Sequence, residues 1–250
     1  MKHPEILLMF HCEKNTGYAI GRLEAVFYEA AIVAGFKPDD IYWSFNGGVN
    51  PGGEKIISCG YKNKVDCDAL DLFLSKRNIV VALAFDLGYP ADVLSVLKRH
   101  GVSIVSYWGG SMSSINSGVK LTIKKIEWLL RKNKPDFFVF ESKAMQLTAT
   151  HGRGVPQSCT SIVHLGVDTN KFYPAYEDFY YAHEALGVDR ARKIIFYSGH
   201  MEERKGVRII IQAAISLFEG GEDSGVHFVL CGNKPGEESR VFKNLKKKKS

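Results

Sequence analysis

The chain has 250 residues, of which 45% are apolar, and a formal net charge of +6. This length holds one large domain or two ordinary ones, and the apolar share is that of a soluble globular protein. The five cysteines are irregularly spaced, which argues against a disulfide framework or a zinc site, and no apolar run is long enough for a signal peptide or a membrane span. We therefore expect a cytoplasmic protein.

Apolar strand-like runs alternate with amphipathic helix-like segments along most of the chain. The predicted strands lie, in chain order, at residues 6–10, 41–45, 79–85, 102–107, 136–140, 161–165, 193–197 and 227–231. The predicted helices lie at residues 22–34, 68–75, 91–100, 121–132, 143–150 and 207–218. Because the strands are continuous apolar runs, they predict a parallel sheet covered by helices on both faces. The predicted fold class is therefore α/β, with a Rossmann-like parallel sheet.

Two segments interrupt this rhythm. Residues 47–53 are rich in Gly, Pro and Asn, which is typical of a loop. Residues 170–192 interleave aromatic and charged side chains, and we interpret them as a linker with a short helix ending near Gly187. The expected domains are thus residues 1–169 and 193–250, joined by this linker.

In a parallel sheet, ligands bind in the loops at the carboxyl ends of the strands. The polar and aromatic residues of those loops in the first domain are therefore candidate ligand contacts. Asp86 has an alternative role, because a lone Asp after a strand is often a turn former. The candidates are His11, Asp86, Tyr89, Trp108, Gly109, Glu141 and Ser142.

The segment 198–206 joins a predicted strand to a predicted helix and has glycines near both ends. Glycine lets the backbone approach a ligand closely, and a helix N-terminus favours an anion. Arg204 and Lys205 add positive charge at this point, and Lys commonly binds phosphate. The segment therefore predicts a phosphate site, although an ordinary loop with solvated charges would have the same composition. It lacks the spacing of a Walker loop.

Several short motifs follow one another in a fixed order after residue 165. They are Gly166-Val167-Asp168, Phe172-x-Pro174, Gly199 with Lys205-Gly206, and Gly232 with Pro235. Individually they are weak signals. In this order and spacing they resemble glycosyltransferase family 4, whose members have the GT-B fold of two Rossmann-like domains. The resemblance covers residues 136–235, and before that it is architectural.

The resemblance implies a retaining glycosyltransferase that uses a nucleotide-sugar donor and needs no cofactor and no metal. The first domain would bind the acceptor, a glycan or a lipid-linked sugar, and the second the donor. His200 stands where the family has an Arg, and a neutral imidazole lacks that fixed charge. The donor-diphosphate candidates are Gly199, His200, Arg204, Lys205 and Gly206. The glycine loop that approaches the donor in the family falls on Asn15, Thr16 and Gly17.

Members of the family also carry a pair of glutamates, with seven residues between them, well downstream of the turn after Gly232. No such pair follows in this sequence. We therefore expect the second domain to be truncated and the chain to be inactive alone. Four consecutive lysines at residues 246–249 suggest a frame change or a cut at an adenine-rich tract, which the downstream DNA would test.

Residues 119–134 have the pattern of a basic amphipathic helix. Val119, Ile123, Ile126 and Leu130 share one face, and residues 120–134 carry six basic side chains against one Glu. One interpretation is a surface helix whose apolar face packs on the sheet. The other is contact with an anionic membrane, which would place the protein peripherally at the inner membrane face. A local basic patch favours such partners over nucleic acid, which we do not expect to bind.

Two alternatives to the glycosyltransferase remain. One is a non-catalytic remnant that keeps the acceptor domain and binds a glycan or lipid without a nucleotide sugar. The other is a sugar-nucleotide epimerase or hydrolase of the same two-domain shape. The latter needs its own acid/base pair, and the sequence shows no close pair of carboxylates that qualifies.

Overall fold

The chain divides into two compact units, residues 1–166 and 167–250, in the computed structural model. The structure describes residues 3–14, 18–47, 55–61, 64–174, 179–199, 201, 203–219 and 224–232. None of the helices in these segments is both long and apolar enough to cross a lipid bilayer.

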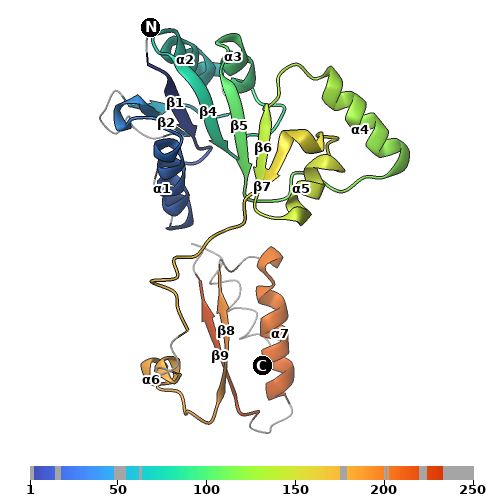
Figure 1. Ribbon diagram of the computed structural model, residues 1–250. Helices are drawn as coiled ribbons and strands as arrows, with labels where there is room; N and C mark the ends of the chain where they lie inside the picture. Colours follow the sequence, from blue (N-terminus) through green and yellow to red (C-terminus); the bar gives the residue numbers. More distant parts are fainter. Residues whose placement is uncertain are drawn as a thin grey trace. The chain divides into compact units, whose positions relative to one another are not determined.

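The first unit alternates strands and helices (Figure 1). Its strands are β1 Glu5–Met9, β2 Ile41–Phe45, β3 Ile56–Ser58, β4 Ile79–Phe85, β5 Ser103–Trp108, β6 Phe137–Phe140 and β7 Thr160–Ile162. Its α-helices are α1 Tyr18–Val33, α2 Lys64–Ser75, α3 Val93–Arg99, α4 Gly118–Leu130 and α5 Lys143–Thr150, with 3₁₀ turns η1 Pro38–Asp40 and η2 Gln157–Cys159. The predicted α/β fold is confirmed.

All seven strands pair in parallel, in the order β3-β2-β1-β4-β5-β6-β7. The chain moves from β1 outward to β2 and β3, then returns to β4 on the other side of β1 and continues outward. The order therefore reverses between β1 and β4. In open α/β sheets, the crevice at the carboxyl ends of the two strands at such a point is where ligands bind.

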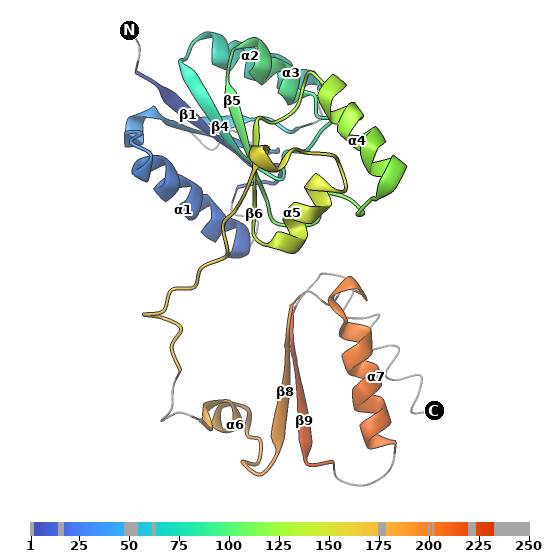
Figure 2. The same cartoon turned by 45° about the vertical axis from the view of Figure 1, so that its right-hand side comes forward.

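Strand β1 shows why the sheet is buried on both faces. Leu7 and Met9 contribute to one core cluster, which α2, α3, α4 and α5 also join. Ile6 and Leu8 point the other way and pack with Phe27 of α1. Successive side chains of a strand alternate between faces, so a fully apolar run needs a cover on each side. Figure 2 shows α1 on one face of the sheet and the other helices on the opposite face.

Some element boundaries differ from the predictions. Helix α1 begins at Tyr18 rather than at residue 22, and the predicted strand 161–165 ends at Ile162. The short strand β3 was not predicted, because its three residues do not establish a pattern. The predicted loop at 47–53 lies outside the described residues except for Gly47.

Helix α4 also corrects one of the two sequence interpretations. Its apolar stripe does not pack on the sheet, since Val119, Ile123, Ile126 and Leu130 are 76%, 56%, 51% and 77% exposed. The helix is instead anchored by Trp128, which is 5% exposed and belongs to the core. The face that the helix turns inward is therefore the one that carries Trp128.

The second unit, as described, holds two parallel strands and two helices. Its elements are α6 Tyr181–Leu186, β8 Lys193–Ser198, the 3₁₀ turn η3 Glu203–Lys205, α7 Val207–Phe218 and β9 Val226–Cys231. Helix α6 ends at Leu186, near Gly187 as predicted, and Gly187 is its C-cap in the left-handed conformation with φ +63°. Strand, turn, helix and strand follow one another here in a single β-α-β unit.

Candidate functional site

The carboxyl edge of the first sheet collects several of the predicted residues. Each lies one or two residues after the end of a different strand, and strands β1 and β4 flank the point where the strand order reverses. The residues at this edge, which we call the switch-point crevice, are His11, Asp86, Gly109, Glu141 and His164.

His11 lies on an aromatic surface at the end of β1. Its ring is stacked on Phe85, with centroids 5.3 Å apart and an interplanar angle of 20°, and it lies 5.9 Å from the ring of Tyr61. The Tyr61 hydroxyl lies 2.9 Å from the Met9 carbonyl oxygen and 2.8 Å from that of Phe85. Tyr61 therefore links the ends of β1 and β4, and burial raises its pKa well above the usual range.

Asp86 adopts a conformation that is uncommon for a residue with a side chain. Its φ is +52°, and its backbone N–H donates to the Tyr107 carbonyl at 2.8 Å. Its carboxylate accepts a 3.0 Å hydrogen bond from the Gly109 N–H. Burial raises the pKa of Asp86, while the Gly109 N–H and the nearby His11 oppose the rise and Glu141 adds to it.

Glu141 joins the crevice from β6. Its Oε1 accepts a 2.9 Å hydrogen bond from the Tyr107 hydroxyl, and its backbone oxygen lies 3.1 Å from Nδ1 of His164. Burial and then this hydrogen bond raise the pKa of Tyr107, so the phenol stays protonated and donates. The adjacent Ser142 has a structural task as well, because its Oγ accepts from the Met145 N–H at 3.3 Å and caps α5.

Two glycines at this edge lie where a side chain would crowd its neighbours. A Cβ on Gly109 would lie 3.2 Å from the Phe85 ring and 3.5 Å from Glu141 Oε1, and one on Gly88 would lie 3.1 Å from Trp108. Within the described residues, the indole N–H of Trp108 is buried without a hydrogen-bond partner. The loops after β4 and β5 are thus held close together around Asp86.

The structure separates Tyr89 from this group. Its ring packs against Trp128 of α4 at 5.5 Å, and its hydroxyl lies 3.5 Å from the Arg153 carbonyl oxygen. Tyr61, Tyr107 and His164, by contrast, were not predicted. His164 fell inside the predicted strand 161–165, whereas β7 ends at Ile162 and leaves it in the carboxyl-edge loop.

The second predicted site lies between β8 and α7. Gly206 is the N-cap of α7 with φ +78°, and Lys205, directly before it, is exposed. A helix begins with N–H groups that have no partner within the helix, so this end carries partial positive charge. His200, the side chain of Arg204 and Pro235 lie outside the described part of the chain.

Gly199 and Gly232 lie against each other at the ends of β8 and β9. The Gly199 N–H donates to the Cys231 carbonyl at 3.0 Å, and a Cβ on Gly232 would lie only 1.7 Å from the Gly199 oxygen. A residue with a side chain at Gly232 would therefore clash with the backbone of Gly199. The strand ends therefore present bare backbone beside the turn.

The predicted glycine loop, Asn15, Thr16 and Gly17, lies outside the described residues. Helix α1 begins directly after it at Tyr18, so the loop precedes a helix N-terminus. In the described segments, no group of three or more His, Cys, Asp or Glu side chains is arranged to hold a metal ion.

Comparisons with known proteins bear on the fold. No protein-family model matches the chain. The crystal structure of Anabaena Alr3699/HepE in complex with UDP has a TM-score of 0.63 and 15% identity, covering 97% of this chain. A glycosyltransferase from Rickettsia africae ESF-5 has a TM-score of 0.66 and 15% identity, covering 98% of this chain. The fold is therefore that of the GT-B glycosyltransferases.

A curated relative is similar in sequence over a shorter stretch. Over 102 residues, which are 40% of this chain, it is 28% identical to D-inositol 3-phosphate glycosyltransferase of Corynebacterium urealyticum (strain ATCC 43042 / DSM 7109). The matched stretch spans 24% of that relative, and the chain spans 65% and 66% of the two solved structures.

Proposed function

We propose that the chain belongs to a glycosyltransferase that takes its sugar from a nucleotide-sugar donor. The observation that carries this proposal is the turn between β8 and α7. There Gly199 follows β8, Lys205 is exposed, and Gly206 caps the helix, in the order and spacing of family 4. The GT-B fold and the glycosyltransferase names of the similar proteins support the same reaction class.

The turn suits the chemistry of the leaving group. As the bond between the sugar and the diphosphate breaks, negative charge grows on the diphosphate and positive charge on the sugar ring. A cation and a helix N-terminus at the leaving phosphate stabilise that transition state. Lys205 and the first turn of α7 would supply both. By the motif order, we further propose transfer with retention and without a metal.

The switch-point crevice suits the acceptor. The carboxylates of Asp86 and Glu141 accept hydrogen bonds from hydroxyl groups, and one Asp86 oxygen is already oriented by the Gly109 N–H. The stacked rings of His11 and Phe85 offer a flat apolar face beside them. Flat rings next to hydroxyl acceptors are the lining that a sugar needs, so we assign the glycan or lipid-linked acceptor to this crevice.

We also propose peripheral contact of helix α4 with an anionic membrane. The exposed stripe Val119, Ile123, Ile126 and Leu130 is flanked by lysines, and this combination is typical of helices that lie at a lipid surface. Lys120 and Lys125 are exposed on the same helix.

The decisive experiment measures binding of nucleoside diphosphates and their sugars to the full chain. We expect at least one of them to raise Tm. At a hundredfold excess of ligand over Kd, binding increases the free energy of unfolding by about 2.7 kcal/mol. Lys205→Ala should weaken that ligand about tenfold, since it removes one charged contact worth about 1.4 kcal/mol. Lys193→Ala, at the other end of β8, is the matched control and should bind normally. A flat panel, or equal losses in both variants, would refute the donor site.

A further inference from the structure

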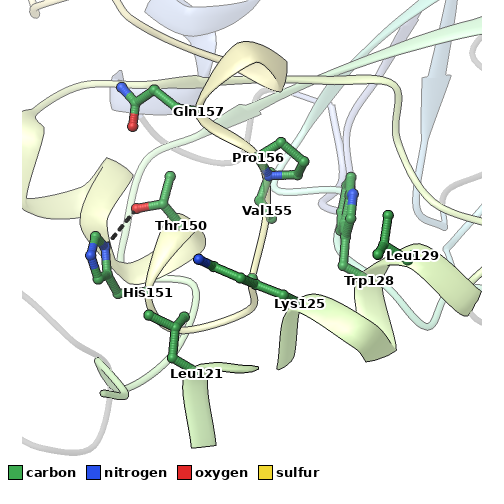
Figure 3. A pocket seen from close by; sticks show the side chains of 10 residues that line it. Leu121, Lys125, Trp128, Leu129, Thr150, His151, Val155, Pro156 and Gln157 are labelled. Carbon is green, nitrogen blue, oxygen red and sulfur yellow. Dashed lines mark hydrogen bonds between the residues drawn. The ribbon is translucent and has the colours of Figure 1, made fainter. Parts of the chain in front are cut away.

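A separate cavity of about 420 Å³ lies in the first unit between α4 and the segment that follows α5. Figure 3 shows its lining, in which Leu121, Lys125, Trp128 and Leu129 come from α4 and His151 and Val155 from the other wall. This volume is within the range of small-molecule sites, about 300–1,000 Å³. None of its lining residues belongs to the switch-point crevice, and we call it the α4 slot.

The walls of the α4 slot are apolar and fixed in position. Trp128 and Val155 are core residues, 5% and 2% exposed. Gly154 has φ +73°, and a Cβ on it would lie 2.4 Å from both the Lys124 carbonyl carbon and the Lys125 nitrogen. The backbone of α4 therefore rests directly on Gly154, which holds the two walls at a set separation. Pre-formed apolar walls are what an aliphatic chain requires.

One end of the slot is cationic. The Lys125 side chain is directed toward Thr150 and His151 (Figure 3). Among the described residues, Lys125 has no ion-pair partner, whereas its neighbour Lys124 pairs with Glu127 at 2.7 Å. A cation that is free of a carboxylate remains available to an anionic ligand.

His151 adds a second polar atom at this end. The Thr150 hydroxyl donates to the Gln146 carbonyl oxygen at 3.3 Å, and its oxygen lies 3.0 Å from Nδ1 of His151. At the end of α5, the Ala149 carbonyl accepts from the N–H groups of Arg153 and Val155.

We propose that the α4 slot binds a linear single-chain amphiphile with an anionic head group. The head lies at Lys125 and His151, and the aliphatic chain lies between Leu121, Trp128 and Val155. Leu129, which is 73% exposed, forms the apolar rim of the slot and borders the exposed stripe of α4. This site is independent of the proposed sugar transfer.

The test is calorimetric titration of the full chain with monomeric probes below their micelle concentration. Decyl phosphate and decanoate should bind saturably at one site, and the tighter of the two identifies the head group as a phosphate ester or a carboxylate. Decyltrimethylammonium, with the same chain and the opposite charge, should bind at least tenfold more weakly. Equal affinity for the cationic probe, or no saturable binding of either anionic probe, overturns the proposal.

Matched variants localise the site. Lys125→Glu should weaken decyl phosphate at least tenfold, while Lys120→Glu, an exposed lysine of the same helix outside the slot, should not. Leu129→Ser should weaken it several-fold, while Leu130→Ser, 77% exposed on the apolar stripe, should leave it unchanged. All four side chains are exposed, so folding is preserved. Equal losses within either pair would place the binding elsewhere.

Discussion

Asp86 combines two features that cost stability. It has a side chain at φ +52°, and burial raises the pKa of its carboxyl. A carboxyl whose pKa is higher in the folded than in the unfolded chain binds more protons when the chain is folded. The free energy of unfolding therefore falls as pH rises from the unfolded-state pKa through the folded-state pKa. Such features are common at functional sites, where the surrounding structure holds them in place. They are consistent with the acceptor role proposed for this residue.

We expect Asp86→Asn to stabilise the protein at pH 7.5. Asn carries no charge, can still accept from the Gly109 N–H, and tolerates positive φ well. The expected rise in Tm is about 2–4 °C, the shift that about 1 kcal/mol produces in a unit of this size. The gain should shrink as pH falls and Asp86 itself becomes protonated, because burial raises its pKa.

Thermal unfolding followed by circular dichroism from pH 4 to pH 8 measures this effect. Asp39→Asn is the control with the opposite sign, because the hydrogen bond and charge of Lys55 lower the pKa of exposed Asp39. That variant should have an unchanged or slightly lower Tm at pH 7.5. A lower Tm for Asp86→Asn, or a gain independent of pH, would contradict the interpretation.

Single residues of the crevice were partly predictable. His11, Asp86 and Glu141 follow apolar runs, and parallel strands bring their carboxyl ends to one edge, so their grouping needed only the fold class. The Tyr107–Glu141 hydrogen bond depends on the register of β5 against β6, which local sequence does not encode. Tyr89 was assigned to the same edge, but its ring packs toward α4 because Trp128 offers it a partner there.

Among the elements, α4 carries apolar side chains that its own unit does not cover. Its apolar stripe is exposed along the length of the helix, on the side away from Trp128. We expect the full chain to co-sediment with anionic vesicles at low salt, and Ile123→Glu with Ile126→Glu to reduce the bound fraction at least tenfold. The two glutamates remove apolar contact with the lipid, and their negative charges are repelled by the anionic vesicle surface.

The control for this measurement is Leu72→Glu, an apolar residue of α2 that is 58% exposed. It should bind vesicles as the unaltered chain does. Binding should fall as salt is raised, since exposed charges are screened within about 10 Å at 0.1 M. Absence of binding at low salt, or an equal loss in the Leu72 variant, would exclude α4 as the contact.

Most elements could be predicted, because long apolar runs and helical periodicity are local properties. The orientation of α4 could not be, since its stripe has the pattern of a packed face. What turns that face outward is non-local, namely Trp128 in the core and the close contact of the helix backbone with Gly154. Strand β3 exists only because β2 offers it an edge to pair with.

For the whole molecule, the described aromatic side chains that follow the first unit are accessible. Phe172 and Tyr173 are 58% and 69% exposed, and Phe179 is 78% exposed. We expect chymotrypsin to cleave first between residues 172 and 181 and to leave a resistant fragment that contains the first unit. Mass spectrometry of a short digestion time course identifies the first cut.

The double variant Phe172→Ser with Tyr173→Ser should remove the earliest of these cuts without changing Tm, because both side chains are exposed. First cuts inside the first unit would instead show that the predicted linker at 170–192 is not the boundary.

The alternation of strands and helices predicted the fold class of the first unit. The strand order was not readable locally, since it depends on the side to which each crossover returns.

The contact between Gly199 and Gly232 has a consequence for engineering. The carbonyl oxygen of one glycine fills the space that the other would need for any side chain. A ligand bound at Gly232 would therefore meet peptide groups there rather than a side chain. Substitution of Gly232 therefore offers no route to a different selectivity, and redesign of such a site would have to begin with the residues around it.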